Sequence, residues 1–156
     1  MSSIVPETAT HHRRQRWLSV LAKAPADRLE SLWTAVAEPP AYTVLRRPEI
    51  GLIMVKGRVS GSGVPFAAGE MTVTRAAIRL ASGEVGFGYV GGRHLKQAEI
   101  VAVIDALGQC PDWQEELEET VIAPLEREAD LRHRAIRTQA AATKVDFFTV
   151  AREAGT

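Results

Sequence analysis

The stretch from Tyr42 to Gly92 restricts the fold of this chain more than any other part of the sequence. β-Branched and aromatic residues gather there in short runs, and Pro48-Glu49, Gly61-Ser62-Gly63 and Ser82-Gly83 separate the runs. The pattern predicts an antiparallel meander of about four strands, with Ser82-Gly83 as the clearest hairpin turn. The predicted strands run from Tyr42 to Arg46, from Leu52 to Val59, from Met71 to Leu80 and from Val85 to Val90.

Helical periodicity predicts two short helices before the meander. Thr10 is a candidate cap for the first, and the apolar residues that follow it at helical spacing are Trp17, Val20, Leu21 and Ala24. We expect the arginines of this segment, Arg13, Arg14 and Arg16, to face mostly solvent. After Pro25 the pattern repeats as far as Val36, and Pro39 stops it.

Further helices are predicted after the meander. The first has an apolar stripe made of Ile100, Val103, Ile104 and Leu107. Pro111 begins an acidic helix, and Pro124 is expected to divide it from a last helix with the charge spacing of a solvated face. The sequence therefore predicts an α+β fold, in which an antiparallel sheet is flanked by N-terminal and C-terminal helices.

Length and composition limit the domain organisation and the classes of function. The 156 residues suit a single domain, with residues 1–9 expected to be mobile and residues 141–156 expected to form a C-terminal tail. The 19 basic residues balance 19 acidic ones, which does not indicate a nucleic-acid-binding chain. Cys110 is the only cysteine, so this chain alone forms no disulfide or Cys-rich metal site. We expect a cytoplasmic protein without a membrane span.

The glycine-rich run at residues 86–91 matches the GxGxxG pattern of dinucleotide-binding proteins, and Asp105 follows at nearly the distance of a ribose-binding acid. The run itself resembles a strand, however, with Phe87 and Tyr89 on one face and the glycines on the other. The preceding hairpin also favours an antiparallel sheet, so a Rossmann-type site is disfavoured. Because no phosphate loop, nucleophile elbow or metal-ligand spacing is present, no catalytic residue and no metal ligand are predicted.

Three arginines are candidates for binding an anion. Arg93 follows two glycines just before a predicted helix, and free N–H groups beside a guanidinium suit a phosphate; an exposed arginine at a simple turn is the alternative. If residues 69–80 form a strand, Arg75 and Arg79 share one face, where they could hold an oligophosphate or pair with carboxylates. The same two arginines also suit a helix, since they lie at i, i+4.

The C-terminal tail contains two adjacent phenylalanines, Phe147 and Phe148, of only four in the chain. Neighbouring side chains point in different directions in a strand or a helix, so one surface of this protein can hardly bury both rings. A partner that covers one ring would explain the pair, with Lys144 and Asp146 at the rim of the interface. The alternative is a tail wrapped across its own sheet and helices.

Several stretches in the order found here carry a resemblance to a known family. They are Gly69-Glu70 with Thr72 to Ala76 and Arg79-Leu80, Tyr89-Val90 with Gly92-Arg93 and Ala98-Glu99, Asp105 to Leu107, Pro124-Leu125, and Lys144 to Thr149. Together they resemble the G subunit of the bacterial phosphonate carbon–phosphorus lyase core complex, from Trp17 onward. The family pattern has Asp after the Gly-Arg pair, where this chain has His94.

The resemblance implies a small accessory subunit that assembles with H, I and J subunits, most directly with I. Such subunits are needed with the H, I and L proteins to displace adenine from ATP and join an alkylphosphonate to C1 of the ribose, in phosphonate catabolism during phosphate starvation. It assigns nucleosidase activity to I and the iron–sulfur cluster to J, so ATP is a substrate of the complex and this chain binds no cofactor. The alternatives are a scaffold that stabilises I and a catalytic domain that uses Arg75, Arg79 and Arg93.

Overall fold

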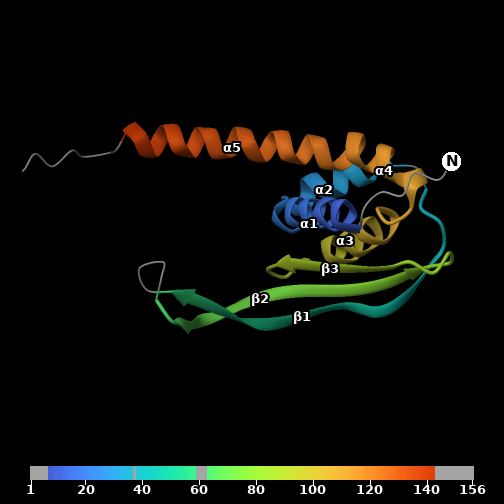
Figure 1. The fold of residues 1–156 in the computed structure, drawn as a ribbon, viewed down its shortest axis with the longest axis horizontal. Coiled ribbons are helices and arrows are strands. Elements are labelled where there is room, and N and C mark those ends of the chain that lie inside the picture. The colour runs from blue at the N-terminus through green and yellow to red at the C-terminus, as the bar shows by residue number, and fades with distance from the viewer. Residues whose placement is uncertain (1–6, 37, 59–62, 143–156) are drawn as a thin grey trace, which may run out of the picture.

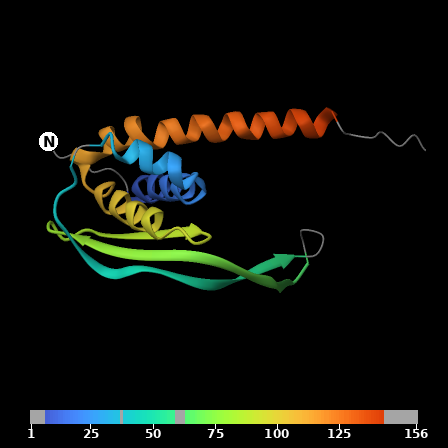
Figure 2. The same ribbon diagram turned by 180° about the vertical axis from the view of Figure 1, so that it is seen from behind.

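Helices cover one face of a small antiparallel sheet and leave its other face open, as Figures 1 and 2 show from opposite sides. The computed structural model describes residues 7–36, 38–58 and 63–142. The elements are α1 (Glu7–Lys23), α2 (Ala26–Trp33), β1 (Tyr42–Arg58), β2 (Pro65–Leu80), β3 (Val85–Gly91), α3 (Leu95–Leu107), α4 (Pro111–Leu117), the π-helical turn η1 (Glu118–Ile122) and α5 (Ala123–Ala142). The predicted α+β class is confirmed.

The sheet has three strands in the order β1-β2-β3, one fewer than the sequence predicted. The first two predicted strands are a single strand, β1, which pairs with β2 from Tyr42 opposite Leu80 to Arg58 opposite Pro65. The register shifts between Arg46 and Glu49 instead of turning. Pro48 lies at this irregularity, which is tolerated because β1 is an edge strand and a bulge needs no N–H donor there.

Strand β2 alternates between the two faces of the sheet. Its residues on the inner face, which the helices cover, are buried, and they are Thr74, Ala76, Ile78 and Leu80. Arg75 and Arg79 lie on the outer face, as a period of two requires. The helical alternative for this segment is therefore wrong.

Helix α3 lies very close to strand β3. A Cβ atom added to Gly88 would lie 1.8 Å from the carbonyl oxygen of Ala98, and one added to Gly86 would lie 1.9 Å from that of Ala102. Any side chain at either glycine would push the helix off the strand. The GxG part of the glycine-rich run thus serves helix-on-sheet packing in this protein.

The N-terminal helix differs from its prediction at its start. α1 already includes Glu7, so Thr10 lies inside the helix and is not its cap. Trp17 and Leu21 are buried, as their spacing predicts. The core lies between the inner face of the sheet and the helices, and its largest fully buried side chains include Leu21, Leu29, Ile78, Ile104, Leu107, Leu117 and Ile122.

The C-terminal helical region runs from α4 through η1 into α5 without a break. Pro124 was expected to divide two helices, but it lies in the first turn of α5. A proline lacks the N–H that would bond four residues back and crowds the carbonyl there, which is that of Thr120 in η1. The wider π-helical turn η1 contains this carbonyl and accommodates the missing hydrogen bond, so the backbone stays helical across Pro124.

Two parts of the molecule extend beyond its body in the same direction (Figures 1 and 2). Strand β3 pairs with β2 only from Val73 to Arg79, so the rest of the β1–β2 hairpin is a two-stranded ribbon. The C-terminal half of α5 likewise continues past α1 and α3.

We predict that Gly88→Ala lowers the free energy of unfolding by about 3 kcal/mol, because the added methyl group meets a backbone carbonyl that cannot move without shifting α3. Gly91→Ala is the matched control in the same strand, since nothing lies within 4 Å of its added Cβ. Urea denaturation of both variants measures the difference. Equal stability of the two variants would show that α3 can shift freely on β3.

Candidate functional site

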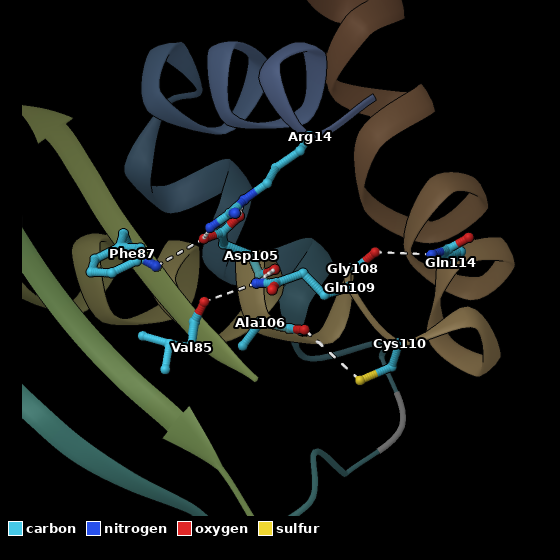
Figure 3. A network of polar contacts seen from close by, with 9 residues as sticks. All are labelled: Arg14, Val85, Phe87, Asp105, Ala106, Gly108, Gln109, Cys110 and Gln114. Carbon is cyan, nitrogen blue, oxygen red and sulfur yellow. Dashed lines mark hydrogen bonds and ion pairs between the residues drawn. The ribbon is translucent and has the colours of Figure 1, made fainter. Parts of the chain in front are cut away.

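Asp105 is a buried carboxylate that joins three elements of the fold (Figure 3). Its side chain is 1% exposed, and Arg14 of α1 donates to both carboxylate oxygens at 2.8 Å. The backbone N–H of Phe87 in β3 donates to the same carboxylate at 2.9 Å. The hydrogen bond to Asp105 raises the pKa of Arg14, so its guanidinium stays charged at any ordinary pH. The expectation that Arg14 faces solvent is wrong.

The neighbourhood of Asp105 leaves no room for a nucleotide. The cavity beside it, lined in part by Arg14 and Trp17, has a volume of about 20 Å³, which accommodates about one water molecule. Since the carboxylate is already occupied by a guanidinium and a backbone N–H, its role here is to hold α1, α3 and β3 together.

Polar contacts around the C-terminal end of α3 continue this network (Figure 3). The amide of Gln109 donates to the carbonyl oxygen of Val85 at 2.8 Å and to that of Asp105 at 3.0 Å. Cys110 follows directly, and burial together with the nearby Glu84 raises the pKa of its thiol. A raised pKa keeps the sulfur protonated at neutral pH, so this cysteine is a poor nucleophile.

Arg75 lies in a charged cluster on the outer face of the sheet. Its Nε donates to Glu49 at 2.7 Å, and Arg46 donates to the same oxygen at 2.7 Å. These two bonds, that of Arg46 first, lower the pKa of Glu49, and hydrogen bonds to Tyr89 and Glu49 raise that of Arg75. A shallow hollow of about 190 Å³, lined partly by Tyr89 and Phe87, lies beside the cluster. Arg75 therefore has a carboxylate partner within this chain.

Arg79 and Arg93 lie apart from each other along the sheet. Arg79 is opposite Val85 at the start of β3, whereas Arg93 follows Gly91 at its end. Both are exposed, and within the described residues neither forms an ion pair. The register thus brings Arg75 and Arg79 onto one face but does not gather all three arginines around one point.

The turn that carries Arg93 is held by a buried threonine. Thr74 Oγ1 donates to the carbonyl oxygen of Gly92 at 2.7 Å and accepts from the N–H of His94 at 3.0 Å. Gly92 has a φ of 84°, which favours glycine at this position. The His94 side chain makes no capping hydrogen bond to α3, so no side chain caps the start of this helix.

Other kinds of site are absent from residues 7–36, 38–58 and 63–142. No group of three or more His, Cys, Asp or Glu residues is placed to hold a metal ion there, and no helix in these ranges has the length and apolar character needed to cross a membrane. The predicted interface residues Lys144, Asp146, Phe147 and Phe148 lie outside the described part of the chain.

Sequence reasoning missed the pairing of Arg14 with Asp105. A usable signal was present, because Asp105 interrupts a helix that is otherwise almost wholly apolar from Ile100 to Leu107. An acid in a buried helix needs a cationic or hydrogen-bonding partner, and the arginines of α1 are candidates.

These observations define a small α+β domain with a one-sided sheet, in which Asp105 and Glu49 are engaged in structural ion pairs. Comparison with known proteins gives its family. The model for "Phosphonate metabolism protein PhnG" matches residues 12–153, and the chain belongs to this family. It is 41% identical over 143 residues to the "Alpha-D-ribose 1-methylphosphonate 5-triphosphate synthase subunit PhnG" of Rhizobium meliloti (strain 1021), across 90% of this chain and 89% of that protein. The resemblance to the G subunit family is confirmed.

We predict that Arg14→Ala lowers the free energy of unfolding by about 2 to 3 kcal/mol, since it leaves a buried carboxylate without its cation while Arg14 itself is partly exposed. Arg13→Ala, next in the sequence and without an ion pair among the described residues, is the control and should cost about 0.5 kcal/mol or less. Urea denaturation measures both. A cost for Arg14→Ala no larger than that of the control would contradict a structural role for the pair.

We predict that Arg75→Gln raises the pKa of Glu49 towards its ordinary value, because one of the two guanidiniums that stabilise the carboxylate is lost. A lowered carboxylate pKa adds stability above the ordinary pKa, and that stability is lost as the pH falls through the lowered value. Carbon NMR titration of the Glu49 side chain reports the change, and Arg79→Gln serves as the control. An unchanged Glu49 titration in Arg75→Gln would contradict the pairing of Arg75 with Glu49.

Proposed function

We propose that this chain is an accessory subunit of a ribose 1-methylphosphonate 5-triphosphate synthase. In this proposal it assembles in the cytoplasm with H, I and J subunits, most directly with I. Together with the L protein, the complex transfers the ribose 5-triphosphate moiety of ATP to an alkylphosphonate and releases adenine. The observation that carries the proposal is the relative named as a subunit of that synthase, which matches this chain at 41% identity over nearly its whole length.

The polar groups of the described residues support an accessory role. Asp105 is paired with Arg14, Glu49 with two arginines, and the thiol of Cys110 has a raised pKa. Each of these groups is engaged by its own fold, so none is poised as a base or nucleophile. The chain then contributes through contacts with other subunits, which supports the accessory role over the catalytic-domain alternative.

Two sets of residues carry the specific parts of this proposal. Lys144, Asp146, Phe147 and Phe148 are proposed to contact a partner subunit, with one phenylalanine ring buried in that subunit. Arg79 and Arg93 are the stronger anion candidates, because Arg75 already has Glu49 as its partner. We propose no metal and no cofactor for this chain.

We predict that the purified chain releases no adenine from ATP, whereas the H, I, J and L proteins release it with an alkylphosphonate only when this chain is added. Chromatographic measurement of adenine checks both arms. Adenine release by the pure chain that is lost in Arg75→Ala would support the catalytic-domain alternative. If the other subunits release adenine at the full rate without this chain when the I subunit is kept soluble, the chain is only a scaffold that stabilises I.

A further inference from the structure

Two projecting arms distinguish this fold from a closed domain (Figures 1 and 2). We define the ribbon arm as residues 51–58 of β1 with residues 65–72 of β2, and the helix arm as residues 131–142 of α5. In the body, α1, α2 and α3 fill the layer between the sheet and α5. Beyond the body, the described residues supply no such layer between the arms.

On the inner face of the ribbon arm, strand β1 presents apolar side chains where the helices end. Leu52 is paired with Thr72 and Met54 with Glu70, positions that continue the inner face of β2 from Thr74 outward. Leu52 is 63% exposed and Met54 is 62% exposed, whereas the residues of β2 on the same face under the helices, from Thr74 to Leu80, are almost fully buried. Strand β1 therefore leaves two large apolar side chains uncovered on this face, beside Thr72 and Glu70 of β2.

Helix α5 also carries apolar side chains beyond the body, in a groove that it shares with α1. Leu125 is 2% exposed in the core, and the same side of α5 continues through Ala129, Arg132 and His133 to Ile136, which is 62% exposed. Leu125, Ala129 and Ile136 line a groove of about 590 Å³ together with Val20 and Ala24 of α1. The groove begins against α1 and runs out along the helix arm, where Ile136 stays exposed beside the basic residues Arg132 and His133.

Charge restricts what can lie between the arms. The helix arm carries Arg132, Arg134 and Arg137 and contains no acidic residue. Two copies joined arm to arm would therefore set like charges against each other. The chain's own residues 143–156 hold two acids, Asp146 and Glu153, that are balanced by Lys144 and Arg152. A complementary occupant needs an excess of acidic groups beside an apolar surface.

We propose that the two arms together bind one helical segment of a partner subunit, apolar on its buried side and acidic at its edges. This segment continues the layer that α1 and α3 form in the body, with the inner face of the ribbon arm below it and the helix arm above it. A two-stranded ribbon and a helix end are each marginally stable in water, so such a segment stabilises both. Exposed apolar surface of this kind marks interaction sites on monomers. The inference rests on the proposed function, because it takes the partner to be another synthase subunit.

The test for the ribbon arm compares neighbouring residues that point to opposite faces. Met54 lies on the inner face, while Val55, 40% exposed and opposite Gly69, lies on the outer face. With the H, I and J proteins as the probe, Met54→Glu should weaken association about tenfold or more, as the loss of a buried apolar contact does. Val55→Glu should change it less than about twofold. Equal effects of the two variants would overturn the assignment to the inner face.

The helix arm is tested by its charge. The double variant Arg134→Glu with Arg137→Glu should also weaken association about tenfold, because its new carboxylates oppose the acidic edges of the segment. Arg127→Glu, the same charge change on the part of α5 beside the body, is the control. All of these positions are exposed, so thermal melting should show unchanged folds. A double variant that binds like the control would overturn the charge argument.

Photo-cross-linking from the two arms decides the identity of the occupant. A benzophenone side chain placed at Leu52 and, separately, at Ile136 should label the same helical segment of one partner subunit, rich in Asp and Glu at its edges. Labelling of residues 143–156, of a second copy, or of two different subunits would overturn the proposal. Adenine release by the assembled complex separates this inference from the function it rests on. If arm variants assemble and release adenine like the wild type, the binding role of the arms is refuted and the accessory role stands. If the other subunits release adenine without this chain, the accessory role is refuted.

Discussion

The close contact between α3 and β3 is the constraint on which the rest of the structure depends. Gly86 and Gly88 present bare backbone to the carbonyls of Ala98 and Ala102, so the helix axis lies nearer to the sheet than ordinary side chains allow. That position brings Asp105 to the N–H of Phe87 and Gln109 to the carbonyl of Val85. Helix α1 then packs against both α3 and β3, and α2 packs against α3 and η1.

A buried carboxylate follows from this arrangement and has consequences for function. Asp105 needs a cation within the fold, and Arg14 supplies it from α1, which fixes the first helix against the third. Glu49 is likewise held by Arg46 and Arg75. These two carboxylates, which could otherwise act as bases or ligands, therefore form structural ion pairs within the fold. The ribbon arm and the helix arm leave apolar and basic side chains exposed, and such surfaces suit assembly with other chains.

Turns and strands whose sequence signal depends on neighbouring residues are the ones that the sequence predicted correctly. The turn at Ser82-Gly83 and the alternation of β2 were predicted because turn residues and a period of two are local properties. The predicted strand break at Pro48 and the predicted helix break at Pro124 were wrong, because a proline ends a strand or helix only when the surrounding structure cannot accommodate it. An edge-strand bulge accommodates the first, and a π turn accommodates the second.

The sequence by itself determined the α+β class, the family and the alternation of β2, because these depend on residue order and periodicity alone. Only the tertiary structure decided that Arg14 meets Asp105, 91 positions away, and that Arg79 and Arg93 lie at opposite ends of β3. It also decided that the ribbon and α5 extend past the helices between them. These features depend on how far each element reaches relative to the others in space, and a periodic pattern carries no information about that distance.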